Sequence, residues 1–231
     1  TNNMAFSYDS SDSSILNILS AKSCTITNTN FIHEISQESD DLLNPYIIKA
    51  CCNLICDNVT IKDCGKSEYA LLFDPSAGIP PFDDGDGGYF NDKTIFCITN
   101  CNFLDSGDVC VFHKTIEFTF INSTVRNAKN GLIYDIEAHL FQSENDCIEV
   151  RGSVFDNLSI CACSLYVWCS VTFENNTIKN CYHDDLNTPL CSIQFLNDTF
   201  TSFSFKDFVF ENNQVKNGNA KGELLNSRFV N

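Results

Sequence analysis

One histidine and two aspartates are the residues of this chain best placed for acid–base chemistry. His113 lies 13 residues after Asn100, and Asp135 lies 13 residues after Asn122. Asp74 ends a similar apolar stretch earlier in the chain. Histidine titrates near neutral pH and a carboxylate can orient it, so an Asp–His–Asp column could serve as general acid and base. The competing interpretation is that all three are polar residues at exposed strand ends.

An acidic segment resembles part of a calcium-binding loop. It reads DDGDGG at residues 83–88, where Asp83, Asp84 and Asp86 would supply oxygen ligands. The distal glutamate of an EF-hand is missing at the required spacing, so a flexible acidic turn is the alternative. Calcium is the one cofactor that the sequence suggests.

The cysteines allow two interpretations. Fourteen cysteines in 231 residues fit either a secreted disulfide scaffold or a core packed with free thiols. The second is favoured, because strand side chains alternate between two faces and many cysteines share the phase of the apolar residues. The CxC at residues 161–163 and the CxxxC at residues 97–101 resemble zinc spacings without a second pair at a diagnostic distance. We expect these cysteines to be buried and mostly unbridged: Cys24, Cys52, Cys56, Cys64, Cys169 and Cys181.

Composition excludes some function classes. The formal net charge is −16, which disfavours binding to nucleic acid. No apolar run approaches the roughly 18 residues that a membrane span needs. The chain has no signal peptide and no initiator Met, so we expect a mature product or an excised segment. Five N-glycosylation sequons begin at Asn58, Asn122, Asn157, Asn175 and Asn197.

A repeated six-residue phrase predicts the elements that must position these residues. It reads apolar, any, Asn, any, small or polar, apolar, as in ITNCNF at 98–103 and FINSTV at 120–125. Asn and Gly both accept the left-handed conformation of a sharp bend, and stacked Asn side chains can bond to one another. Two gaps of 22 and 23 residues among longer ones indicate a unit of about 22 residues with inserted loops. The predicted ladder residues are Asn28, Asn58, Asn100, Asn122, Gly152, Asn175 and Asn212.

Three short strands per unit follow from this register. In one unit they cover residues 102–104, 109–113 and 116–121, and the second strands of the other units cover 46–50, 69–73, 132–136, 161–167, 190–195 and 223–225. Insertions fall after the second strand (76–91, 137–146 and 198–204) or before it (33–44 and 182–189). The register also predicts one buried apolar row: Phe96, Phe118, Ile148, Val171 and Phe208.

The pattern resembles the right-handed parallel β-helix of pectate-lyase-like proteins. The resemblance implies an all-β solenoid of about seven three-strand coils with an Asn ladder, as a single domain over residues 1–231. Similar Asn- and Cys-rich repeats occur in surface proteins and adhesins. Carbohydrate-active members of the family carry Asp, His and basic residues on an outer strand face, and the short motifs of the hydrolases are absent here.

The expected function is a non-catalytic structural or adhesive module of a surface, extracellular or filamentous assembly. The alternative is a polysaccharide hydrolase or lyase that uses Asp74, His113 and Asp135. We expect protein partners or self-association through the ends of the coil stack, and glycans are a further class of ligand. An extracellular or cell-surface location is expected, whereas reduced cysteines would favour an intracellular assembly.

Overall fold

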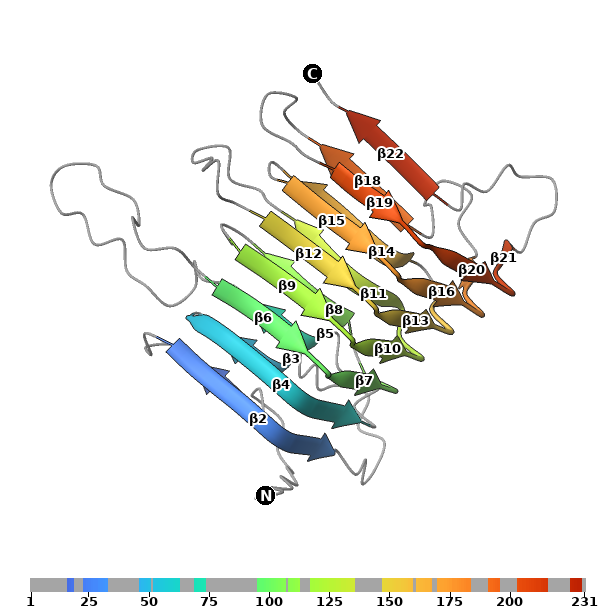
Figure 1. Ribbon diagram of the computed structural model, residues 1–231. Helices are drawn as coiled ribbons and strands as arrows, with labels where there is room; N and C mark the ends of the chain where they lie inside the picture. The colour runs from blue at the N-terminus through green and yellow to red at the C-terminus, as the bar shows by residue number, and fades with distance from the viewer. Residues whose placement is uncertain are drawn as a thin grey trace, which may run out of the picture.

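The structure is a computed structural model, and it describes only part of the chain. The described residues are 16–18, 23–32, 46–50, 52–62, 69–73, 95–106, 108–112, 117–135, 147–159, 161–167, 170–183, 191–195, 203–215 and 225–229. They form β-strands joined by bends, with no helix among them, and every strand pair is parallel (Figure 1). The expected all-β class with parallel strands is therefore confirmed.

Eight strands form one sheet, which lies behind the long front strands in Figure 1. Its strands follow one another in chain order, so each new strand is added at the same edge. They are β1 (Leu16–Ile18), β3 (Tyr46–Ala50), β5 (Tyr69–Phe73), β8 (Asp108–Phe112), β11 (Asn130–Asp135), β14 (Cys161–Val167), β18 (Cys191–Phe195) and β22 (Leu225–Phe229).

Twelve strands form the second sheet, which contains two parallel rows. One row holds five-residue strands and one four-residue strand: β6 (Ile95–Thr99), β9 (Glu117–Ile121), β12 (Cys147–Arg151), β15 (Ser170–Glu174) and β19 (Phe203–Lys206). The other row holds three-residue strands: β7 (Asn102–Leu104), β10 (Thr124–Arg126), β13 (Val154–Asp156), β16 (Thr177–Lys179) and β20 (Val209–Glu211). Two ten-residue strands, β2 (Ser23–Ile32) and β4 (Asn53–Lys62), run through both rows.

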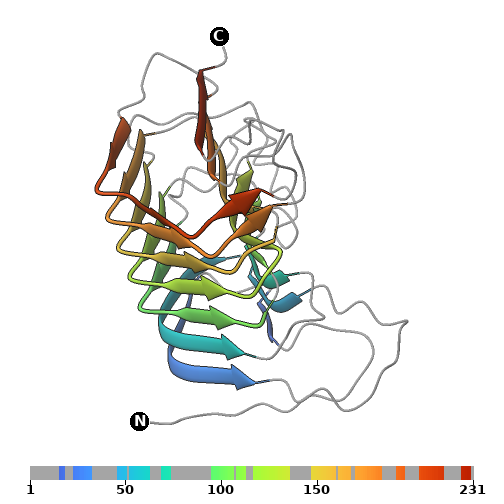
Figure 2. The same cartoon turned by 90° about the vertical axis from the view of Figure 1, so that its right-hand side faces the viewer.

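We call each long strand, the bend after it and its short strand a rung, so that β6–β7 and β9–β10 are two rungs. Figure 2 shows each long strand turning into its short strand, with successive rungs stacked in parallel. A small third sheet pairs β17 (Tyr182–His183) with β21 (Gln214–Val215).

Alternation of side chains builds the core between the two sheets. The residues two positions before the bend that joins the long and short strands of a rung, such as Ile98, Phe120 and Phe173, are fully buried. The residues three positions after it, such as Phe103 and Phe155, are buried to the same degree. Neighbouring rungs stack these rings, as between Phe120 and Phe155 with centroids 6.0 Å apart. Burial of each rung's apolar face thus depends on the next rung.

The predicted apolar row is confirmed except at its end. Phe96, Phe118, Ile148 and Val171 are buried and pair in register. Val171 pairs with Phe203 in the next strand, however, and Phe208 lies after the bend instead. The sequence assignment was wrong there because it took the final bend from a later asparagine.

Several predicted second strands match the structure residue for residue, namely 46–50, 69–73 and 161–167. The others shift by one or two residues at one or both ends, and the last strand covers 225–229 where 223–225 was expected. The long chain segments between strands also fall at the two expected places, as between β5 and β6 and between β2 and β3.

Where β8 pairs with its two neighbours, it contributes one residue fewer than the strand opposite. Asp108 and Val109 face Tyr69 and Leu71 in β5, and Asn130 and Leu132 in β11. Ala70 and Gly131 are therefore extra residues in the flanking strands, as in a β-bulge. A consequence is that Asp135 pairs with Phe112, and not with residue 113 as a constant spacing of 22 had implied.

Candidate functional site: two polar columns at the bends

Two columns of left-handed residues run along the stack of rungs. The first bend column lies between the long and short strands and contains Asn28, Asn58, Asn100, Asn122, Gly152, Asn175 and Asp207. The second bend column follows the short strands and contains Asp105, Asn127, Asn157, Asn180 and Asn212. All twelve residues have φ between 50° and 59°. Asn, Asp and Gly are the residues that accept this conformation at least cost.

Asn212 is a ladder residue of the second bend column and not of the first. The backbone NH of Asn175 donates to the carbonyl of Lys206, which places Asp207 beside Asn175. The NH of Asn180 donates to the carbonyl of Glu211, which places Asn212 beside Asn180. The six other predicted ladder residues occupy the first bend column as expected.

Backbone hydrogen bonds tie each bend to the next rung. The NH of Asn100 donates to Ile121 O at 3.0 Å, and the NH of Asn122 donates to Arg151 O at 2.9 Å. In the second bend column the NH of Asn157 donates to Lys179 O at 3.0 Å. The bends therefore continue the hydrogen bonding of the sheets through the corners.

Side-chain amides form a partial ladder on the outside of the columns. Asn58 Nδ2 donates to Asn28 Oδ1 at 2.7 Å, and Asn157 Nδ2 donates to Asn127 Oδ1 at 2.7 Å. Asn127 Nδ2 in turn donates to Asp105 Oδ1 at 2.7 Å. Each amide thus donates toward the preceding rung.

At two places a carboxylate takes over the role of the amide oxygen. Asn100 Nδ2 donates to Asp57 Oδ1 at 2.8 Å, and Asn180 Nδ2 donates to Asp156 Oδ1 at 2.7 Å. Both aspartates stand directly before a bend asparagine. A carboxylate accepts these hydrogen bonds more strongly than an amide oxygen does.

A second, buried ladder lies inside the first bend. Cys101 N donates to Ser123 Oγ at 3.1 Å, and Ser123 N donates to Ser153 Oγ at 3.2 Å. Ser153 N donates to Asn176 Oδ1 at 2.9 Å, and Asn176 Nδ2 donates to Val150 O at 2.9 Å. Buried backbone groups at a turn are costly unless they are bonded, so these inward polar side chains stabilise the bend.

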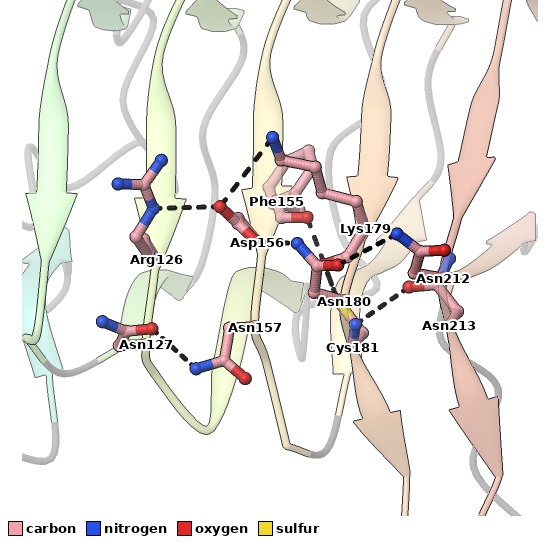
Figure 3. A network of polar contacts seen from close by, with 10 residues as sticks. All are labelled: Arg126, Asn127, Phe155, Asp156, Asn157, Lys179, Asn180, Cys181, Asn212 and Asn213. Atoms are coloured by element: carbon pink, nitrogen blue, oxygen red, sulfur yellow. Dashed lines mark hydrogen bonds and ion pairs between the residues drawn. The ribbon is translucent and has the colours of Figure 1, made fainter.

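Asp156 is the centre of a polar network that spans three rungs (Figure 3). Its side chain is 11% exposed, and Oδ2 accepts from Arg126 Nε at 3.0 Å and lies 4.0 Å from Lys179 Nζ. Its other oxygen accepts from Asn180. These residues stand in register on β10, β13 and β16, immediately before the second bend column. The charge of the carboxylate is therefore matched by its neighbours above and below.

Glu174 holds the corresponding place before the first bend column. It lies in register between Arg151 on β12 and Lys206 on β19. Its carboxylate is 3.2 Å from Lys206 Nζ and 3.7 Å from Arg151 Nε, and it accepts a hydrogen bond from Ser204. The Ser204 hydroxyl and the two cations lower the pKa of Glu174 against the opposing effect of burial.

Both networks repeat one arrangement, in which an arginine, an acid and a lysine follow one another on successive rungs. Every carboxylate oxygen of Asp156 is already bonded or paired within the stack. Such a group stabilises the rungs, because its charge is neutralised by contacts within the stack. The two charged networks are therefore parts of a framework in which acids and bases pair with one another.

The cysteines whose side chains the structure describes are free thiols. Cys52, Cys56 and Cys181 are buried as predicted, whereas Cys24 is only partly buried. Burial raises the pKa of Cys101 to about 11 and that of Cys161 to about 12. These thiols are consequently protonated at neutral pH, which makes them poor nucleophiles. Cys64 and Cys169 lie outside the described residues.

Most of the sequence-derived catalytic and metal candidates also lie outside the part of the chain that the structure describes. This applies to Asp74 and His113, and to the calcium candidates Asp83, Asp84 and Asp86. Asp135 is placed at the end of β11. The acid–base column and the calcium site remain predictions. In the described residues no three His, Cys, Asp or Glu side chains are grouped so that they could hold a metal ion.

Sequence reasoning missed the second bend column and both charged networks. A constant spacing of five residues marks the column, from Asn100 to Asp105, Asn122 to Asn127 and Asn175 to Asn180. Each charged residue of the two networks stands one position before the bend residue of its own rung. Aligning the rungs on two bends instead of one would have brought Arg126, Asp156 and Lys179 together.

Comparison of the chain with protein-family models, with curated proteins and with solved structures finds no match. A search for helices that could cross a membrane finds none in the described segments.

Proposed function

We propose that the chain is a right-handed parallel β-helix of about seven three-strand coils, forming one domain over residues 1–231. The support is that both sheets add their strands in the same direction along the stack. Two bend columns recur at the same five-residue separation in successive rungs. A chain that winds around one axis produces both features, because each turn must visit every sheet once.

We further propose that this β-helix is a non-catalytic structural or adhesive module of a surface, extracellular or filamentous assembly. The observation that carries the proposal is the mutual pairing of polar side chains at the bends. Arg126 and Lys179 both pair with Asp156, from the rungs on either side of it. The same holds for Arg151, Glu174 and Lys206. Charged groups used in this way make a rigid support.

The division of charge supports a role for the inter-strand segments in binding. The described residues contain ten acidic and eight basic side chains, a net charge of −2. The remaining residues therefore account for −14 of the total of −16. Partners with basic surfaces would be attracted to the segments between the strands. Further protein partners would bind at the ends of the stack, where a terminal strand can pair with another chain.

Activity and binding assays on the same ligands test this function. The purified chain is incubated with acidic polysaccharides while released reducing ends and unsaturated sugars are measured, and binding to the same immobilised polymers and to basic proteins is recorded. We expect binding to the basic proteins and no turnover of the polysaccharides, and the same result for His113→Ala. Turnover that His113→Ala abolishes would contradict the proposal and favour a polysaccharide-degrading enzyme.

A further inference from the structure

Four residues of the first bend column, three asparagines and one glycine, determine which N-glycosylation sequons can carry a sugar. Asn58, Asn122 and Asn175 each begin an Asn-x-Ser/Thr sequence, and all three side chains are exposed at a left-handed bend. Gly152 stands between Asn122 and Asn175 in the column. The sequence alone does not distinguish these sequons, because the bend phrase itself generates Asn-x-Thr.

Hydrogen bonding separates the sequons into two groups. Asn58 Nδ2 donates to Asn28, and Asn157 Nδ2, in the sequon between those of Asn122 and Asn175, donates to Asn127, both at 2.7 Å. Within the described residues, the side chains of Asn122 and Asn175 form no hydrogen bond. Their amide nitrogens are therefore the ones that can be modified without breaking a ladder contact.

Gly152 accounts for this difference. Elsewhere in the ladder each side-chain amide donates to the preceding rung. The residue that precedes Asn175 in its column is Gly152, which has no side-chain oxygen to accept from Asn175 Nδ2. On the other side, Asn122 Oδ1 lies 2.6 Å from the position that a Cβ on Gly152 would occupy. The Asn122 amide thus leans into the space left by the missing side chain.

We propose that Asn122 and Asn175, the two asparagines on either side of Gly152, are N-glycosylation sites of this chain. In the transfer, Nδ2 forms a bond to the anomeric carbon of a lipid-pyrophosphate-linked oligosaccharide. The bond from that carbon to the pyrophosphate oxygen breaks, the lipid pyrophosphate leaves with the electron pair, and Nδ2 loses one proton. The inference rests on the surface or extracellular location in the proposed function.

Space in the column supports the same two positions. Stacked strands are about 4.8 Å apart, which is less than the width of a sugar ring. A sugar on Asn58 would meet ladder side chains on both sides, from Asn28 and Asn100. A sugar on Asn122 or Asn175 has Gly152 as its neighbour on one side, and Gly152 contributes no side chain to the column.

Expression of the chain as a secreted protein in a eukaryotic host tests the assignment. In the secretory pathway the chain meets the enzyme that transfers the oligosaccharide, whatever the natural location of the protein. The folded, secreted product is digested, and sugar occupancy at each sequon is measured by mass spectrometry after enzymatic deglycosylation in ¹⁸O-labelled water. We expect sugars at Asn122 and Asn175, and free asparagine at Asn58 and Asn157. Failure here would leave the proposed module function untouched, since that function is tested on unmodified protein.

Two variants serve as matched controls. Thr124→Ala and Thr177→Ala each destroy one sequon while leaving the bend asparagine in place, so each should remove the mass of one glycan from the secreted chain. Sugars at Asn58 and Asn157 in the folded product would overturn the proposal. So would a secreted product in which Asn122 and Asn175 are unmodified.

Discussion

Gly152 shows how much of a bend depends on backbone conformation and how much on the side chain. It shares a left-handed φ with Asn122 and Asn175, at 59°, 50° and 54°. Asn tolerates this region, whereas a β-branched residue there is a true outlier. The side chain that Asn122 extends toward Gly152 ends in a movable amide.

Two substitutions at Gly152 should therefore differ sharply. We expect Gly152→Val to lower the free energy of unfolding by about 1–3 kcal/mol, because it combines left-handed strain with crowding against Asn122. Gly152→Asn should remain close to the parent, because Asn accepts the conformation and its amide can join the ladder. Urea unfolding followed by circular dichroism measures both, and equal losses for the two variants would argue against a left-handed bend.

Asp156 offers a test of the charged networks. Asp156→Asn keeps the shape but removes the charge that accepts from Arg126 and Asn180. Because the side chain is nearly buried, we expect a loss of about 1–3 kcal/mol in the free energy of unfolding. Lys129→Gln, at an exposed position, is the control and should change it by less than about 0.5 kcal/mol. A neutral Asp156→Asn would show that the network contributes nothing to stability.

The buried thiols predict a decline in stability at alkaline pH. The folded pKa of Cys101, about 11, lies above the unfolded value of about 8.5. A raised pKa means that stability is complete below about pH 8.5 and falls as the pH rises toward 11. Cys101→Ser keeps a donor for the Thr99 carbonyl and removes the titration. Urea unfolding at pH 7, 9 and 10 should show a shallower decline for this variant, and identical profiles would contradict the assignment.

At the scale of strands, the bulged pairing of β11 with β8 explains where the sequence register failed. The bend asparagines Asn100 and Asn122 predicted their strands well, because apolar alternation and bend chemistry agree there. The extra residue at Gly131 does not change the spacing between the bend asparagines. The sequence register therefore placed Asp135 opposite residue 113, whereas it pairs with Phe112. Its cause is local, since Asp108 accepts from both the backbone and the side chain of Asn130.

Gly131 should tolerate no side chain. A Cβ there would meet the carbonyl oxygen of Ala162 and lie 2.7 Å from Phe155 Cδ1. Both are fixed by the sheet and the core, so we expect Gly131→Ala to cost about 1–3 kcal/mol or more in unfolding free energy. Ser159→Ala, at an exposed position nearby, is the comparison. An unchanged urea midpoint for Gly131→Ala would mean that β11 does not pass this close to β14.

At the scale of the whole molecule, sequence reasoning identified the class of fold but only one of the two bend columns. The first column could be found because its asparagines stand in a constant apolar phrase. The second was hidden because Asp105 takes the place of Asn and the apolar residues around it vary. Asn212 was then assigned to the wrong column, since FENNQV fits the phrase better than the segment around Asp207 does. Charge pairing between rungs could be recognised only after both columns were aligned.

The central claim is that successive rungs stack in parallel with two bends in register. Scalar couplings across hydrogen bonds, measured by NMR on deuterated, ¹⁵N- and ¹³C-labelled chain, test it most directly. The account predicts couplings from Asn100 N to the Ile121 carbonyl, from Asn157 N to the Lys179 carbonyl and from Asn175 N to the Lys206 carbonyl. A coupling from Asn175 N to the Glu211 carbonyl would contradict the account, because Asn212 would then lie in the first bend column.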